Sequence, residues 1–563
     1  MEEGPIIRIC RFILFSATVA FAIAGTAQAK RTDDGTKLLK RFVEARLADV
    51  GGQTDTALSI YQDSLKRQPD NALVAGKTYV RAIETGNWQL ALKAVRSIGL
   101  GGSLEKEMPG LLFSDAFRMQ DWKSARYALA QLEELGNFAF LAPMLENWVA
   151  LAKNRTSGVS FENLEKNRTA RYYLEEQRIL LLLASGENED ALKGLRDVVE
   201  KNDVRMSPVR MMAARHFLSL NEVGAAKEIL KSQRTLAERR LLDIMEAGKS
   251  QLVAQEITPQ VGTAYTFHRL SADLGSQRAP FLALVMAQIG SNIAGQTDFN
   301  QLVLGRAYTA ANNGSQARKA YQKIEASSPY FVIARNAEIG SFIDDKNFTD
   351  ALERIEKQIA DKPTLPELHV LKGQIHLANK KYKDAAKAYQ TAVSLAVDEQ
   401  YQKPVLASYY LALGSAQEQA GLWPDGLDSL KKANQLLPDS ANILNYLGYA
   451  QLERRENAED AIKAIRRAHE LRSSSPAIKD SLGWAYFIIG EHETAVNYLE
   501  QALTGQPHDP TINEHLGDAY WTVGRRFEAR YAWKTAKLFA DDSDEDRLIA
   551  KIDLGLSPEL ISP

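Results

Sequence analysis

Apolar and small residues recur along the chain with a period of 34 residues, most clearly over residues 477–536. The first copy of the pattern places such residues at Leu482, Gly483, Tyr486, Ala495, Leu499 and Ala502, and the second copy repeats them at Leu516, Gly517, Tyr520, Ala529, Trp533 and Ala536. A period of this length is typical of a two-helix unit that stacks on similar neighbours. The pattern therefore predicts consecutive helical hairpins.

A small residue near the start of the second helix of each predicted hairpin allows the repeat to be followed along the chain. It falls at Ala57, Ala91, Ala125, Ala191, Ala225, Ala283, Ala317, Ala351, Ala385, Gly426, Ala461, Ala495 and Ala529, with Val159 between Ala125 and Ala191. Together with the Leu-Gly-x-x-Tyr motif of the first helix, these positions are the signature of the tetratricopeptide repeat (TPR). We therefore expect an all-α fold, a TPR-type α-solenoid in which about 13–14 hairpins wind into a right-handed superhelix.

Glycine also returns at one position of the predicted first helix. It does so at Gly305, Gly373, Gly414, Gly448, Gly483 and Gly517. Glycine costs about 1 kcal/mol relative to alanine inside a helix. Its repeated use at one position therefore indicates that the second helix approaches closely there.

Two intervals between successive small residues are much longer than 34 residues, with 58 residues between Ala225 and Ala283 and 41 between Ala385 and Gly426. We interpret the larger interval as a junction between two arrays and the smaller one as a longer helix or loop. The predicted organisation is a signal peptide at 1–29, a degenerate TPR-like array at 30–235, an irregular helical junction at 236–262, a C-terminal TPR array at 263–540, and a capping helix with a tail at 541–563. The acidic run at 541–546 favours a solvated cap over a partner-binding tail, since charge runs usually solvate an end.

The N-terminal residues carry the pattern of a secretory signal. Arg8 and Arg11 flank the start of an apolar run at 12–25, and Ala27-Gln28-Ala29 follows. This pattern predicts cleavage before Lys30 and a periplasmic or envelope-associated protein, with an uncleaved anchor as the alternative. The run is shorter than the ~20 residues that a spanning helix needs, so we expect no transmembrane span in the mature chain. Cys10 is the only cysteine, and cleavage would leave neither a thiol nor a lipid-bearing cysteine.

Composition and motifs give no indication of catalysis. The chain has 69 basic and 71 acidic residues, which favours neither nucleic acid nor an anionic membrane as a partner. It contains no H-E-x-x-H, G-x-G-x-x-G, Walker or G-x-S-x-G motif. His369 and His376 are seven residues apart without a third ligand nearby, and we interpret them as packing and surface residues. We therefore expect a non-enzymatic protein without cofactor or metal.

A partner-binding groove is the better candidate for a functional site. In the last three repeats, the positions of the first helix that face the concave side of a TPR array carry Asn445, Tyr449, Asp480, Trp484, Phe487, Glu514, Asp518 and Trp521. Aromatic rings flanked by amides and carboxylates are typical of protein-binding hot spots. The alternative is that Trp484 and Trp521 pack on each other or on neighbouring helices, or lie under the C-terminal helix. The carboxylates indicate a neutral or basic ligand, in the form of a peptide or helix.

Three segments carry a further resemblance: NYLGYAQ at 445–451, DSLGWAYF at 480–487 and NEHLGDAYWTVGRRFEA at 513–529. They resemble the large TPR lipoproteins of Gram-negative bacteria that act as adaptors for carboxyl-terminal processing proteases. That resemblance implies a cell-envelope scaffold that presents partners or substrates, such as cell-wall hydrolases, to an envelope protease. The missing lipid-bearing cysteine is a departure from the family. The alternative prediction is a TPR scaffold of an export or polysaccharide-secretion machine.

Overall fold

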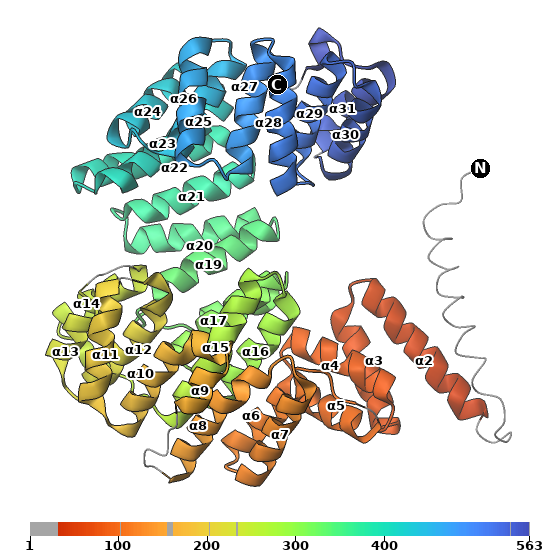
Figure 1. The fold of residues 1–563 in the computed structure, drawn as a ribbon, viewed down its shortest axis with the longest axis vertical. Coiled ribbons are helices and arrows are strands. Elements are labelled where there is room, and N and C mark those ends of the chain that lie inside the picture. The colour runs from red at the N-terminus through yellow and green to blue at the C-terminus, as the bar shows by residue number, and fades with distance from the viewer. Residues whose placement is uncertain are drawn as a thin grey trace. The chain divides into compact units, whose positions relative to one another are not determined.

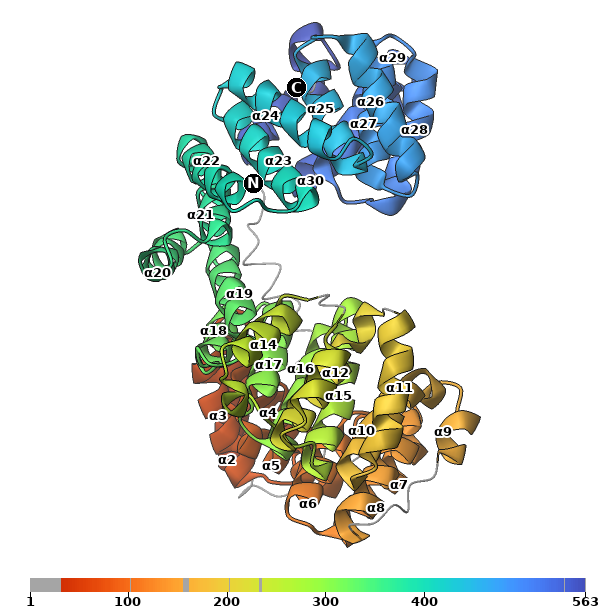
Figure 2. The ribbon, with the colours of Figure 1, turned by 90° about the vertical axis from the view of Figure 1, so that its left-hand side faces the viewer.

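The computed structural model describes residues 32–101, 103–154, 161–201, 203–231, 235–540 and 542–561, and regular structure in these ranges is helical throughout. The predicted signal peptide at 1–29 and Val159 lie outside the described residues. Among the helices that the structure describes, none combines the length and the apolar character needed to cross a membrane. The chain divides into two compact units, residues 1–345 and 346–563 (Figures 1 and 2).

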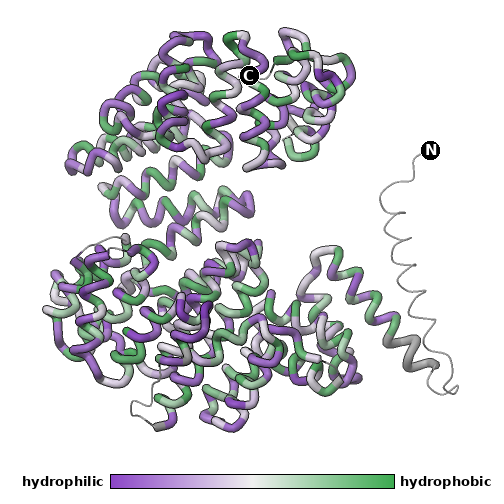
Figure 3. Tube along the Cα trace, in the orientation of Figure 1, coloured by the Kyte–Doolittle hydropathy of each residue, from purple (hydrophilic) through white to green (hydrophobic). Residues whose placement is uncertain are grey.

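The first unit consists mainly of helical hairpins. Its first part contains α2 (Thr32–Val50), α3 (Thr54–Arg67), α4 (Ala72–Thr85), α5 (Trp88–Gly101), α6 (Met108–Arg118), α7 (Trp122–Leu135), α8 (Ala142–Asn154), α9 (Glu162–Lys166), α10 (Leu174–Ser185), α11 (Asn188–Lys201), α12 (Ser207–Ser219) and α13 (Val223–Ile229). Side-chain caps fix several helix starts, as where Asn71 accepts a hydrogen bond from the backbone of Val74. Hydrophobic and hydrophilic residues alternate along the helices, as burial of one face requires (Figure 3).

The rest of the first unit follows α13 directly. It contains α14 (Leu236–Glu246), α15 (Pro259–Ser276), α16 (Pro280–Ala294), α17 (Asp298–Ala310), α18 (Gly314–Gln322) and α19 (Phe331–Asp344). Thr235 and Glu238 form a capping box at the start of α14, which explains why this helix begins where the sequence predicts it. The irregular junction expected at 236–262 contains α14 and ends within α15, which begins at Pro259.

The hairpin α15–α16 lies against α4, α6, α8 and α10, which we call the inner helices of the first unit. Helix α15 contacts α8 and α10, and α16 contacts α4 and α6 (Figure 1). A Cβ on Gly262 would lie 2.0 Å from the ring of Trp148 in α8, so only glycine fits between these two helices. Hydrogen bonds also hold α15 in this position: Gln177 in α10 accepts from Trp148 Nε1 at 2.8 Å and donates to Thr266 Oγ1 at 3.1 Å.

These contacts change the predicted domain boundary. The sequence placed a junction at 236–262 between two arrays, but the compact first unit extends to Asp345. The reason is that the residues after the junction bury their apolar faces on the earlier hairpins. Hydrogen bonds join the same segments: Gln288 Nε2 donates to the carbonyl oxygen of Ile83 at 2.6 Å, across 205 residues of sequence.

The second unit is a stack of hairpins with a final helix. It contains α20 (Phe348–Asp361), α21 (Pro366–Ala378), α22 (Tyr382–Asp398), α23 (Lys403–Gln419), α24 (Trp423–Leu436), α25 (Ala441–Glu453), α26 (Ala458–Leu471), α27 (Pro476–Ile488), α28 (His492–Gly505), α29 (Pro510–Thr522), α30 (Arg526–Phe539) and α31 (Asp542–Leu554). The interval of 41 residues reflects two long helices, because α22 and α23 have 17 residues each. Helix α31 packs on α30, at the position where the sequence predicts a capping helix.

The small residues that mark the repeat are buried, as the pattern predicted. Of those in the list, Ala57, Ala91, Ala125, Ala191, Ala317, Ala351, Ala385, Ala461, Ala495 and Ala529 are fully buried in the second helix of a hairpin. Ala225 is half-buried. The close approach at the recurrent glycine is also confirmed. A Cβ on Gly517 would lie 2.4 Å from the ring of Trp533, and one on Gly373 would lie 2.6 Å from the ring of Tyr389.

Candidate functional site

A cavity of about 750 Å³ lies within the second unit, on the side of the first helices of the hairpins. Helix α25 contributes Leu452 and Glu453 to its wall, α27 contributes Trp484, Phe487 and Ile488, and α29 contributes Trp521 and Thr522. The segment that follows α31 closes one side through Leu556, Ser557, Pro558 and Ile561. We call this cavity and its walls the groove. Its aromatic wall contains three of the eight residues predicted from the sequence.

Trp484 lies deeper than the sequence prediction placed it. Its side chain is 1 % exposed, with the ring parallel to Phe487 at 4.7 Å between centroids and to His515 at 4.1 Å. This arrangement corrects the prediction of an exposed anchor, and the alternative of packing on neighbouring helices describes Trp484. Its Nε1 is buried without a hydrogen-bond partner among the described residues. Trp484 therefore forms the floor of the groove and holds an unused donor.

Trp521 is half-buried and largely covered by its neighbours. The guanidinium groups of Arg526 and Arg530 lie 4.1 and 5.0 Å from its ring centroid, and Trp533 packs at 5.5 Å. Gly555, which follows α31, approaches so closely that a Cβ there would lie 2.1 Å from the Trp521 ring. The predicted alternative of cover by the C-terminal helix thus applies in part, and the remaining ring surface lines the groove.

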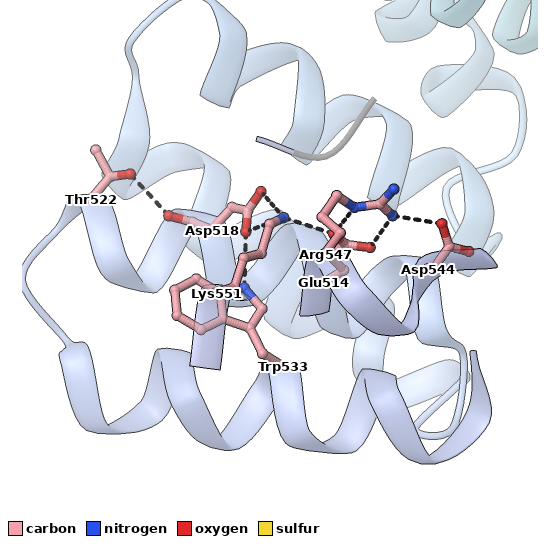
Figure 4. A network of polar contacts seen from close by, with 7 residues as sticks. All are labelled: Glu514, Asp518, Thr522, Trp533, Asp544, Arg547 and Lys551. Carbon is pink, nitrogen blue, oxygen red and sulfur yellow. Dashed lines mark hydrogen bonds and ion pairs between the residues drawn. The ribbon is translucent and has the colours of Figure 1, made fainter. Parts of the chain in front are cut away.

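Glu514 and Asp518 bind α31 rather than facing the groove. Lys551 Nζ donates to Glu514 Oε1 at 2.7 Å and to both oxygens of Asp518 at 2.8 Å (Figure 4). Arg547 donates two further bonds to Glu514, and Trp533 Nε1 donates to Asp518 at 2.9 Å. Burial alone would raise the pKa of Glu514, but the bonds and charges of Arg547 and Lys551 outweigh burial and lower it. Both carboxylates therefore hold the capping helix.

The other predicted polar residues lie beneath the groove. Asp480 Oδ1 is 3.0 Å from His515 Nδ1, and Tyr449 packs against the cluster that contains Trp484. Burial of Tyr449, reinforced by the nearby charge of Glu453, raises the pKa of its hydroxyl. Asn445 is half-buried. Because Asp480, Glu514 and Asp518 all lie inside the unit, the structure removes the basis for expecting a basic ligand.

Sequence reasoning missed several residues of this region. Glu453 lines the groove, and burial raises its pKa. Lys551 is fully buried, and a signal for its role was present in the sequence. Glu514 and Asp518 are four residues apart on α29, as are Arg547 and Lys551 on α31, and two such pairs of opposite charge match one another.

Comparison with known proteins identifies the repeats. One tetratricopeptide-repeat model matches residues 336–399, 370–435 and 411–476, and a second model of the same name matches residues 479–509. Residues 336–476 and 479–509 are tetratricopeptide repeats. Repeats of this family indicate a protein–protein interaction scaffold, and TPR proteins are generally not enzymes.

Individual relatives cover different parts of the chain. The "TPR repeat-containing protein PA4667" of Pseudomonas aeruginosa is 41% identical over 81 residues, which span 14% of this chain and 14% of the relative. The crystal structure of MamA protein is 27% identical and covers 34% of this chain and 98% of its own, with a TM-score of 0.25. Yeast Tom70 is 12% identical and covers 92% of this chain and 96% of its own, with a TM-score of 0.37.

Proposed function

We propose that the groove of the second unit binds an extended segment of a protein partner. The observation that carries this proposal is the cavity itself, which lies on the inner helices of the repeats and has Trp484, Phe487 and Trp521 in its wall. Cavities of this size with aromatic residues and a limited number of polar groups in the wall are typical ligand sites.

The charges around the groove suit an uncharged backbone better than a strongly charged ligand. Its lining contains one acidic residue, Glu453, and two basic residues, Arg455 and Arg526. Burial raises the pKa of Glu453, which favours its neutral form. The groove therefore offers apolar area and isolated polar contacts, which is the combination that recognises an extended peptide.

We further propose that the protein is an adaptor in the bacterial cell envelope that presents partners to an envelope protease or a cell-wall enzyme. The signal-like sequence at 1–29 and the resemblance of residues 445–529 to protease adaptors support this role. Similarity to a bacterial TPR protein over 81 residues is consistent with it.

In-cell photo-crosslinking tests both parts of the proposal. Ile489 lines the groove and is 42% exposed, so it can carry a photoreactive side chain without disturbing the core. We expect it to capture an envelope protease or a cell-wall hydrolase, identified by mass spectrometry. Capture of export or polysaccharide-secretion proteins instead would support the alternative scaffold.

A matched pair of variants makes the test specific for the groove. Thr522 and Thr504 are both exposed residues near a helix end, and each donates its hydroxyl to the carbonyl four residues earlier. Of the two, only Thr522 lines the groove. Thr522→Arg should abolish the crosslink from Ile489, and Thr504→Arg should leave it unchanged. Equal crosslinking in both variants would contradict the proposed site.

A further inference from the structure

One wall of the groove is formed by a segment of the chain that behaves like a ligand. After α31, Gly555 adopts a φ of +91° and turns the chain back toward Trp521. Leu556 and Ile561 then pack against the cluster of Trp484 and Phe487. Ser557 is extended, and a single 3-10 turn at Pro558–Leu560 separates the two aliphatic residues.

The segment at 555–561 is held by Leu556 and Ile561 and by Gly555, which is buried against Trp521. Leu556 and Ile561 are each half-buried, whereas Pro558 and Glu559 between them are exposed. The backbone bonds in this stretch are local, from Gly555 N–H to the carbonyl of Lys551 and from Leu560 N–H to that of Ser557. A segment with two apolar anchors and a solvated middle matches the way an extended peptide occupies a groove.

The segment fills only part of the groove. A cavity of about 750 Å³ remains with residues 555–561 in place. A partner could therefore enter beside the segment and replace it, gaining the aromatic floor that Leu556 and Ile561 now cover. Because the segment is tethered to α31, its effective concentration at the groove is high, on the order of millimolar for a short linker.

We infer that residues 555–561 are a tethered competitor for the groove, and that the partner segment that displaces them carries two aliphatic side chains at a similar spacing. This inference rests on the proposed function, because it assigns the chemistry of the partner at the same site. A partner that occupies the whole groove then releases Leu556 and Ile561. The segment thus selects against weak ligands and sets a threshold for binding.

A peptide-binding experiment on the full chain tests this inference. The probe is a fluorescent peptide with the sequence of residues 555–561, followed by anisotropy. If the tethered segment occupies the groove about nine-tenths of the time, its release should strengthen binding about tenfold. We therefore expect the variant Leu556→Ser/Ile561→Ser to bind the probe about ten times more tightly than the native chain. Equal affinity of the two chains, or no binding to either, would overturn the inference.

Controls separate the inference from the proposed function. Adding Thr522→Arg to the double variant should abolish probe binding, whereas adding Thr504→Arg should not. If the double variant melts at a lower temperature, Ile561→Ser alone and hydrogen exchange of residues 555–561 with and without the probe provide the second readout. A partner crosslinked at Ile489 without binding of the probe peptide would contradict only the inference that residues 555–561 compete for the groove. Binding of the probe peptide without a crosslinked partner would contradict only the proposed adaptor role.

Discussion

In the first unit the hairpin α15–α16 occupies the inner face of α4, α6, α8 and α10, whereas in the second unit the inner helices α25, α27 and α29 border a cavity of about 750 Å³. The hairpins that build the two faces follow the same periodicity. The difference lies in what each face contacts. A repeat pattern therefore determines how hairpins stack, and the occupant of the inner face determines whether that face is available to a partner.

The two occupants also differ in how firmly they are held. Trp148, Gln177 and Thr266 form a buried chain of hydrogen bonds between α15 and the inner helices of the first unit. The segment at 555–561 has only half-buried side chains and local backbone bonds. The first inner face is thus part of a permanent core, and the second is partly covered by a segment that, in our proposal, a partner displaces.

The largest expected effect concerns the helix that carries this segment. Lys551→Met removes a fully buried cation from between Glu514 and Asp518, and breaking a buried ion pair typically costs 3–5 kcal/mol. We expect the free energy of unfolding of the second unit to fall by roughly 3 kcal/mol, since Arg547 still binds Glu514. Urea unfolding measures this change. Lys534→Met on α30 is the control, because Lys534 is exposed, and an equal effect of both variants would contradict the role of Lys551.

A smaller effect is expected at the seat of the hairpin in the first unit. Gly262→Ala places a Cβ against the ring of Trp148, and overpacking of this kind costs about 1–3 kcal/mol. Gly275→Ala lies in the same helix with nothing within 4 Å of the added Cβ, and should be neutral or stabilising by up to about 1 kcal/mol. Hydrogen exchange of α15 distinguishes the two variants. Equal protection of α15 from exchange in the two variants would contradict the close contact between Gly262 and Trp148.

These predictions also show which features could be derived from the sequence. The alanine ladder, the recurrent glycine and the capping helix were predictable because each reflects contacts between neighbouring helices, and such contacts repeat with the period. The position of α15–α16 against the earlier helices was not predictable, since hydrogen bonds such as that from Gln288 to Ile83 join segments 205 residues apart. The sequence left packing of Trp484 as the alternative to an open concave position, because it could not show that His515 and Phe487 cover the ring.

The smallest expected effect concerns one buried histidine in each unit. Burial lowers the pKa of His268 to about 3. Burial would also lower the pKa of His515, but the carboxylates of Asp480, Asp518 and Glu514 outweigh it and raise the pKa above 6.5. The free histidine has a pKa of about 6.5. The stability due to His268 is therefore present above about pH 6.5 and lost as the pH falls below it. The stability due to His515 is present below about pH 6.5 and lost as the pH rises through its raised value.

Urea unfolding between pH 5 and 8, with hydrogen exchange to report each unit separately, measures these opposite slopes. Each histidine contributes at most about 1.4 kcal/mol per pH unit. His515→Gln should reduce the slope of the second unit only. His268→Leu should reduce the slope of the first unit only, where part of the slope remains because burial also lowers the pKa of His216. Slopes of the same sign in both units, unchanged by these variants, would show that the local charges do not control the two histidines.

The central claim is that the groove of the second unit is the surface that meets a partner. Photo-crosslinking from Ile489 in the native cell, compared between the native chain, Thr522→Arg and Thr504→Arg, tests it most directly. The account predicts a crosslinked protein in the native chain and in Thr504→Arg, and none in Thr522→Arg. A crosslink that survives Thr522→Arg, or that is absent from all three chains, would contradict it.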